Sequence, residues 1–200
     1  MIAIVDYGMG NLFSIHNALA RVNASSEIVQ KPEGIVGADG IVVPGVGAFG
    51  KCMERLSRFE LVLAEEFDNG TPILGICIGL QVLFQRSEES PGAKGLGWIR
   101  GDVIKLPEGV MIPQMGWNII SIKRHVDILD GLEDGDMFYF VHSYHCVPTD
   151  KSVIAATTDH GIEVVAVVSK DNLSATQFHP EKSGIKGLRL LENFVRTTRC

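Results

Sequence analysis

The sequence predicts an α/β fold: a doubly wound, mostly parallel central sheet with helices on both faces, joined by a smaller antiparallel sheet. Three observations predict it. Apolar runs of strand length alternate with helical stretches in the first half, helices become scarce after Trp98, and an amphipathic helical pattern closes the chain. Alternating strands and helices are typical of parallel strands joined by right-handed crossovers, with the reactive loops at the carboxyl ends of the strands.

Short apolar runs bounded by turn residues mark the expected strands. In the first half we expect strands at Ile2–Val5, Ile28–Val29, Gly40–Val43 and Ile73–Ile76, and helices at Leu12–Val22 and Met53–Phe67. In the second half we expect shorter strands, several antiparallel, at Val103–Leu106, Trp117–Ile122, Met137–Val141, Val153–Thr158, Glu163–Val168 and Ala175–Phe178, and a closing helix at Ser183–Arg196. No internal repeat or long linker divides the chain, so residues 1–200 are expected to form one domain.

The composition argues against several classes of partner. The 18 basic and 24 acidic residues give a net charge of -6, with no basic stripe for nucleic acid. No apolar run approaches the roughly 20 residues that cross a bilayer, so we expect no membrane association. We expect a cytoplasmic protein with reduced thiols, because no secretory leader is recognisable and the cysteines show no paired spacing: Cys52, Cys77, Cys146 and Cys200.

Cys77 lies where an apolar strand must turn abruptly into a helix. Gly75 and Gly79 let the strand and the helix approach closely around a strained turn, as in the G-x-S-x-G nucleophile elbow. The positive end of a helix favours the thiolate form of a cysteine, which attacks carbonyl carbon atoms. Taken alone, the segment predicts either a nucleophile or a buried core cysteine.

A candidate base lies far downstream, where His179, Pro180 and Glu181 follow a short strand pattern. Residues i and i+2 of an extended chain leave on the same face, and Pro180 biases His179 toward extended geometry. A carboxylate that holds one imidazole nitrogen leaves the other free to take the thiol proton. Taken alone, such a segment is more often a polar strand end. Combined with Cys77 it predicts a Cys-His-Glu triad.

A glycine-rich turn after the third strand supplies a candidate oxyanion site. Attack on an amide places negative charge on its oxygen, and two backbone N–H groups are the usual stabiliser. One would come from Ile78, and the other from Val46 or Gly47, where the glycines at 45 and 47 let the backbone approach a substrate. An ordinary strand-to-helix turn would have the same local sequence.

The sequence predicts no metal and no nucleotide cofactor. Gly8 and Gly10 follow a strand, but Phe13 stands where a dinucleotide fingerprint has its third glycine. His142 and His145 would leave a strand on opposite faces, and no second ligand pair follows them.

Motifs spread over nearly the whole chain resemble those of a known family. They are Asp6-Tyr7-Gly8-Met9-Gly10-Asn11-Leu12, Pro44-Gly45-Val46-Gly47, Gly75-Ile76-Cys77-Ile78-Gly79-Leu80-Gln81, Gly95-Leu96-Gly97, Met115-Gly116-Trp117-Asn118, Phe140-Val141-His142-Ser143-Tyr144 and Phe178-His179-Pro180-Glu181-Lys182-Ser183-Gly184. On these residues the chain resembles the class I, triad-type glutamine amidotransferases of flavodoxin-like fold. Among them it is most similar to the glutaminase subunits of imidazole glycerol phosphate synthase, an enzyme of histidine biosynthesis. One departure is Gln114, where the family usually has histidine.

The resemblance implies hydrolysis of L-glutamine and transfer of ammonia to a cyclase subunit. The cyclase is a (β/α)₈ barrel that forms a heterodimer with the glutaminase and makes imidazole glycerol phosphate and AICAR. The resemblance places the substrate against Gln81, the backbone of His142, Ser143 and Tyr144, and Glu88 or Glu89. It places the partner near Asn11, Gln114, Trp117 and Asn118.

Two alternatives stay open at the level of sequence. A paralogous glutaminase subunit would use the same triad to supply ammonia to another acceptor, such as a sugar. A non-catalytic binding module would keep only the fold, although the presence of Cys77, His179 and Glu181 argues against it.

Overall fold

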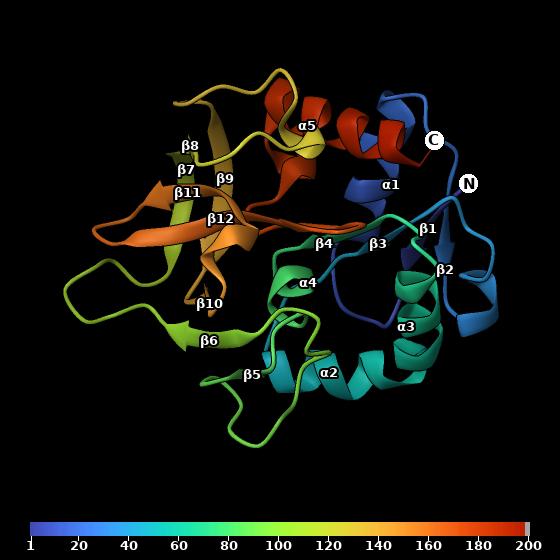
Figure 1. Cartoon of the computed structure of the whole chain (residues 1–200), viewed down its shortest axis with the longest axis horizontal. Coiled ribbons are helices and arrows are strands. Elements are labelled where there is room, and N and C mark those ends of the chain that lie inside the picture. Colours follow the sequence, from blue (N-terminus) through green and yellow to red (C-terminus); the bar gives the residue numbers. More distant parts are fainter. Residues whose placement is uncertain (199–200) are drawn as a thin grey trace.

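The computed structural model describes residues 1–198, and their centre is an eight-stranded sheet with helices on both faces (Figure 1). The strand order is β2-β1-β3-β4-β13-β12-β11-β8. The part from β2 to β13 is parallel, and the part from β13 to β8 is antiparallel. The strands of this sheet are β1 (Ile2–Val5), β2 (Ser26–Val29), β3 (Gly40–Val43), β4 (Ile73–Ile76), β8 (Ser121–Ile122), β11 (Ile154–Asp159), β12 (Glu163–Lys170) and β13 (Leu173–Thr176).

Two smaller sheets lie beside the antiparallel part. A three-stranded sheet has the order β10-β6-β5, and a two-stranded antiparallel ribbon pairs β7 with β9. Their strands are β5 (Arg86–Ser87), β6 (Gly101–Lys105), β7 (Gln114–Ile119), β9 (Met137–His142) and β10 (Tyr144–Pro148). The predicted fold class, a mostly parallel sheet with helices and a smaller antiparallel sheet, is confirmed.

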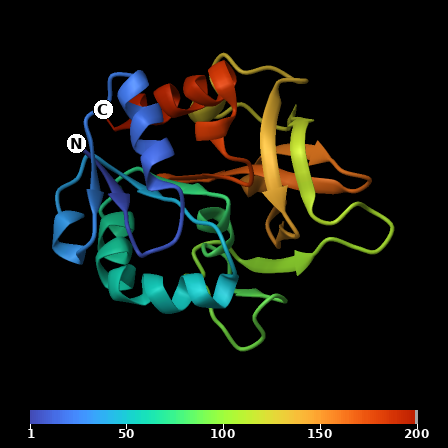
Figure 2. The same cartoon turned by 180° about the vertical axis from the view of Figure 1, so that it is seen from behind.

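The helices divide between the two faces of the central sheet. Figure 2 shows α1 and α5 side by side on one face, with α2 and α3 on the other. The helices are α1 (Leu12–Arg21), α2 (Phe49–Leu56), α3 (Glu60–Asp68), α4 (Ile78–Gln81) and α5 (Gly184–Thr197). Each face has its own apolar core. Phe49, Phe59 and Leu63 lie in one, and Ile15 and Leu190 in the other.

Local sequence explains why α1 begins where it does. The side chain of Asn11 accepts a hydrogen bond from the Ser14 backbone N–H at 3.3 Å, which satisfies one of the donors that a helix start leaves free. Ile15, Ala18 and Leu19 follow at helical spacing and are buried. Asn11 itself remains exposed.

Two predicted elements are wrong in their continuity. The single helix expected at Met53–Phe67 is α2 and α3, separated by a 3-10 turn at Ser57–Phe59 that buries Phe59 completely. The single strand expected at Trp117–Ile122 is divided between two sheets, because β7 pairs with β9 while β8 pairs with β11. Ile120, between the two strands, is fully buried.

Two strands, β5 and β10, were not expected. Both pair with β6, and β10 does so across a long sequence separation that local pattern does not encode. Of the four cysteines, Cys52, Cys77 and Cys146 are buried free thiols, and Cys200 lies outside the described residues. Within residues 1–198, none of the helices is long and apolar enough to cross a membrane.

Candidate active site

Cys77 occupies a strained turn between β4 and α4. Its backbone has φ 56° and ψ -106°, a conformation that residues with a side chain rarely adopt. The flanking glycines are required by space. A Cβ at Gly79 would lie 1.9 Å from the carbonyl oxygen of Val43, and one at Gly75 would lie 2.6 Å from that of Gly79. The elbow predicted from these glycines is therefore a feature of the fold, and it sets Cys77 at the carboxyl end of β4.

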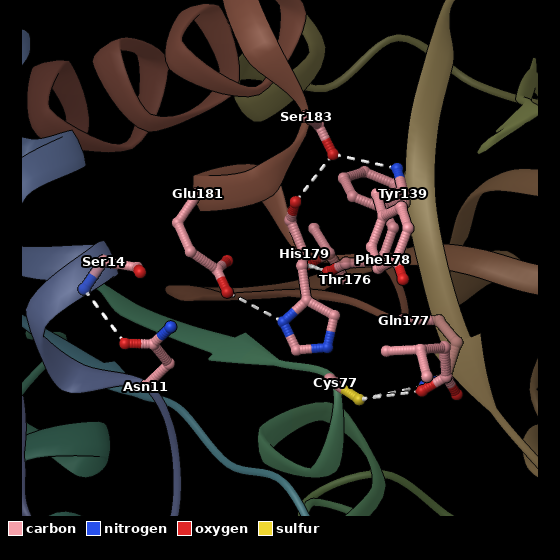
Figure 3. A network of polar contacts seen from close by, with 11 residues as sticks. Asn11, Ser14, Cys77, Tyr139, Thr176, Gln177, Phe178, His179, Glu181 and Ser183 are labelled. Carbon is pink, nitrogen blue, oxygen red and sulfur yellow. Dashed lines mark hydrogen bonds and ion pairs between the residues drawn. The ribbon is translucent and has the colours of Figure 1, made fainter. Parts of the chain in front are cut away.

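His179 and Glu181 meet beside this sulfur. His179 Nδ1 lies 2.8 Å from Glu181 Oε1, and both side chains are almost fully buried. Figure 3 shows the imidazole ring between the Glu181 carboxylate and Cys77, with its second nitrogen directed toward the sulfur. That nitrogen, Nε2, is buried and has no hydrogen-bond partner among residues 1–198.

The backbone around His179 differs from the extended path expected for this segment. His179 is extended, but Pro180–Lys182 forms a 3-10 turn that carries Glu181 back to the ring. Proline suits the first position of such a turn because its missing N–H is not needed there. Ser183 holds the turn, since its hydroxyl donates to the carbonyl of His179 at 2.6 Å and accepts from the N–H of Tyr139 at 3.0 Å.

The surroundings of His179 change its affinity for protons. Burial lowers the pKa of His179, but its contacts with Cys77 and Glu181 more than offset this and raise the pKa to about 9. A histidine with this pKa stays protonated at neutral pH. The arrangement can therefore hold a proton next to a nucleophilic sulfur and deliver it to a leaving group.

A cavity of about 360 Å³ opens over the sulfur. It includes most of the residues expected at the oxyanion and substrate positions. Its lining residues are Val46, Gly47, Cys77, Ile78, Gln81, Glu89, Val141, His142, Ser143 and Tyr144.

Of the two candidate glutamates, the structure brings Glu89 to this cavity, and its carboxylate accepts the N–H of Phe49 at 2.7 Å. Glu88 lies outside the cavity and accepts the N–H of Lys105 at 2.9 Å. Consecutive residues point in different directions here, which the sequence does not indicate.

The glycine-rich turn after β3 is held at two of its carbonyl groups. The hydroxyl of Tyr7 donates to the carbonyl of Pro44 at 2.6 Å, and the thiol of Cys52 lies 4.0 Å from the carbonyl of Val46. Gly47 has φ 114°, a backbone that favours glycine. Ile78, which also lines the cavity, is the first residue of α4, so its N–H has no partner within the helix.

One residue that was not expected from the sequence, Gln177, contacts the sulfur of Cys77. Gln177 is fully buried, and its Nε2 lies 3.9 Å from Cys77 Sγ. Gln81 Nε2 donates to Gln177 Oε1 at 3.2 Å and to the carbonyl of Tyr144 at 3.1 Å. Strand alternation could have indicated Gln177 from the sequence. Gln177 is two residues before His179, so in an extended chain the two side chains leave on the same face.

Two neighbouring polar side chains of the β7–β9 ribbon are buried, and one of them, His142, lines the cavity. His142 Nδ1 is 2.9 Å from the carbonyl of Tyr144, and burial lowers the pKa of His142 to about 4, so the ring is neutral. Gln114 is the cross-strand neighbour of His142 and is 3% exposed, with both amide atoms unpaired among residues 1–198. No cluster of three or more histidine, cysteine or acidic side chains suited to a metal ion occurs in that part of the chain.

Of the four expected partner residues, Asn11 caps α1, and the three on β7 separate between the two faces of the β7–β9 ribbon. Strand alternation turns Gln114 and Asn118 inward, where the Asn118 amide donates to the carbonyl of Asp159 at 2.7 Å. Trp117 points outward and is 52% exposed, in edge-on contact with Tyr139. Alternation therefore places the Gln114 side chain in the interior, and the expected position of its segment near the partner stays a prediction.

Comparison with known proteins agrees with this geometry. The family model described as "Glutamine amidotransferase class-I" matches residues 3–198. A protein named imidazole glycerol phosphate synthase subunit HisH, from Methanothermobacter thermautotrophicus, is 49% identical over 200 residues, covering 100% of both chains. The HisH subunit of Aquifex aeolicus is 48% identical over 196 residues, covering 96% of this chain and 95% of its own.

Solved structures show the same fold at lower identity. A structure of PurLQS from Thermotoga maritima matches with a TM-score of 0.77 and 17% identity, over 98% of this chain and 97% of the other. A crystal structure of a glutamine amidotransferase matches with a TM-score of 0.76 and 19% identity, over 100% of both chains. The chain belongs to the class I glutamine amidotransferases and, within them, to the family of HisH subunits of imidazole glycerol phosphate synthase.

Proposed function

We propose that this chain hydrolyses L-glutamine to glutamate and ammonia through Cys77, His179 and Glu181, and delivers the ammonia to a cyclase subunit. The cyclase would use it to form imidazole glycerol phosphate and AICAR. The observation that carries the proposal is the placement of the His179 ring, which Glu181 holds at 2.8 Å on one side and which faces Cys77 on the other.

The first half of the reaction makes a thioester. The Cys77 thiolate attacks the side-chain amide carbon of glutamine, and the carbonyl electrons move to the oxygen. When the tetrahedral intermediate collapses, the C–N bond breaks and His179 gives its proton to the departing nitrogen. Ammonia leaves and a γ-glutamyl thioester remains on Cys77.

The second half releases glutamate. His179, now neutral, takes a proton from water while the water oxygen attacks the thioester carbon. Collapse of this intermediate breaks the C–S bond and restores the thiolate and the protonated ring. Glu181 orients the ring in both halves and stabilises its charged form. Every group in this scheme belongs to the chain or to its substrates.

The oxyanion would lie between the N–H of Ile78 and an N–H of the Val46–Gly47 turn. Both segments line the 360 Å³ cavity. Gly47 has the backbone freedom that reorientation of a peptide group requires. Docking of the partner would therefore set the orientation of this turn. The glutamine would lie against Gln81 and the 142–144 segment, with Glu89 rather than Glu88 near its α-ammonium.

The outer face of the β7–β9 ribbon is the proposed surface for a (β/α)₈ cyclase in a heterodimer. Met115, Trp117, Ile119 and Met137 are each 49% to 62% exposed on this face. Contiguous exposed apolar side chains of this kind mark interaction sites. The surface continues toward the triad, since Lys182 lies over the Tyr139 ring, 5.9 Å from its centroid.

The proposal is tested by glutamate release from glutamine, measured with and without a cyclase subunit and its ribonucleotide ligand. Cys77→Ala should abolish release, and Cys146→Ala is the matched control because Cys146 is a buried thiol of the three-stranded sheet, outside the cavity lining. Turnover that depends on Cys77 and on the cyclase supports the proposal. Turnover that needs Cys77 but ignores the cyclase would indicate another acceptor, and no turnover in any combination would indicate a binding module.

A further inference from the structure

Gln177 is a buried amide that touches the reacting sulfur. Its side chain is fully buried just after β13, and its backbone N–H donates to the carbonyl of Ala166 at 2.9 Å. Gln177 Nε2 lies 3.9 Å from Cys77 Sγ, and Figure 3 marks this contact with a dashed line. The glutaminase scheme above assigns this residue no role.

One backbone carbonyl determines how this amide is oriented. The carbonyl oxygen of Tyr144 can only accept, so the Gln81 atom 3.1 Å from it must be the NH₂ nitrogen. The same nitrogen lies 3.2 Å from a Gln177 side-chain atom, which must therefore be the Gln177 carbonyl oxygen. The remaining Gln177 atom, directed at the sulfur, is then the NH₂ nitrogen, a donor.

We infer that Gln177 is a fourth catalytic residue, which donates a hydrogen bond to the Cys77 thiolate and is oriented for this by Gln81 and the carbonyl of Tyr144. A donor to the charged form of a group favours that form. Besides Gln177 and the His179 ring, the carbonyl oxygen of Val141 lies 3.9 Å from Sγ, and this oxygen can accept from a thiol but cannot stabilise a thiolate. The role of Gln177 in turnover rests on the proposed function, whereas its effect on the sulfur does not.

The test measures the pH dependence of Cys77 alkylation by iodoacetamide in the chain alone, without glutamine or partner. The other described thiols interfere little near neutral pH, because burial raises the pKa of Cys52 to about 11 and raises that of Cys146. A Cys77→Ser variant supplies the background, including any reaction at Cys200. The midpoint of the profile reports the coupled ionisation of Cys77 and His179.

Two variants change the donor. Gln177→Met keeps the length of the side chain but removes the N–H, and the midpoint should rise by about one pH unit, a tenfold change in ionisation constant. Gln177→Glu retains an acceptor for Gln81 and places a carboxyl group against the sulfur, so a larger rise is expected. The matched control is Gln114→Met, because Gln114 is also buried but its amide has no hydrogen bond among residues 1–198. Its midpoint should equal that of the wild type.

Wild-type midpoints in both Gln177 variants would overturn the inference. If Gln177→Met does not fold, the alkylation midpoints of Gln177→Glu and Gln81→Met test the inference instead. Gln81→Met removes the donor that orients Gln177, so it should also raise the midpoint. With the partner present, Gln177→Met should lower kcat more than it changes KM, because the lost contact is with the sulfur. Absence of glutamate release by the wild type would count against the proposed function and leave the alkylation profiles readable.

Discussion

The carboxylate of Glu181 is bound to His179 through a single oxygen, while its second oxygen, Oε2, is buried without a hydrogen-bond partner among residues 1–198. Glu181 therefore acts through one imidazole ring, whose orientation and charge it controls. An isosteric amide would fit the same space but would not stabilise the protonated ring.

Glu181→Gln should therefore lower glutamate release by a factor on the order of 10²–10⁴, the range for positioned acid–base groups. Thermal unfolding should confirm that the variant is folded. Glu88→Gln is the matched control, because Glu88 lies outside the cavity. Equal losses in the two variants would contradict the proposed role of Glu181.

The lowered pKa of His142 predicts that the folded protein loses stability as the pH falls below neutral. Burial lowers its pKa from 6.5 to about 4 in the folded protein, whereas the unfolded chain has the ordinary value. The unfolded state then binds more protons between these values, so stability is full above about pH 6.5 and falls as the pH drops toward 4. Over this window the contribution is about 3 kcal/mol in the free energy of unfolding.

Urea unfolding of wild type and His142→Gln at pH 7 and at pH 4.5 measures this contribution. The wild type should lose more stability between the two pH values than the variant loses. An equal loss in both would show that the acid sensitivity comes from other groups.

At the scale of the elements, the elbow between β4 and α4 depends on close backbone approach. Gly79→Ala would place a Cβ 1.9 Å from the carbonyl of Val43, so strand and helix must separate. We expect a loss of about 1–3 kcal/mol in the free energy of unfolding, typical of overpacking, together with a strong loss of Cys77 alkylation.

Gly70→Ala is the control for this prediction. A Cβ there meets nothing within 4 Å, so only the positive φ of 84° carries a cost, about 1–2 kcal/mol. Its alkylation rate should equal that of the wild type. Wild-type alkylation in Gly79→Ala would mean that the elbow tolerates wider spacing.

Elements buried on both faces were the most predictable from sequence. The bounds of β1, β3 and β4 agree with their apolar runs, because turn residues bound these runs: Asp6 and Gly8 follow β1, Asp39 and Pro44 flank β3, and Pro72 precedes β4. The break between α2 and α3 was not predictable, since the apolar pattern continues through Phe59 while the backbone tightens to bury it. The division of β7 from β8 depends on pairing partners that lie elsewhere in the sequence.

At the scale of the whole molecule, the exposed face of the β7–β9 ribbon should bind the partner. Trp117→Ala should weaken binding to the cyclase subunit by about 2 kcal/mol or more, as for a central aromatic contact. Titration calorimetry measures it, and unfolding should change little because Trp117 is half exposed.

Leu61→Ala is the matched control for this surface. Leu61 is 80% exposed on α3, away from the β7–β9 ribbon. Its loss should leave the affinity unchanged. If both variants bound the cyclase as well as the wild type, the docking surface would have to lie elsewhere.

The sequence by itself determined the chemistry that is available. It supplied a cysteine between two glycines, a histidine two residues before a glutamate, and a glycine-rich turn after a strand, because these features are local and each is needed where it stands. It also determined the alternation of strands and helices, which depends on apolar periodicity within each segment.

Only the tertiary structure decided which groups meet. β13 pairs in parallel with β4, with Thr176 opposite Ile76, so Cys77 and His179 follow neighbouring strand ends although they are far apart in the sequence. That pairing also brings Gln177 to the sulfur, while the path after β5 turns Glu89 rather than Glu88 into the cavity. Pairing between distant strands depends on the packing of the entire chain, which no local pattern contains.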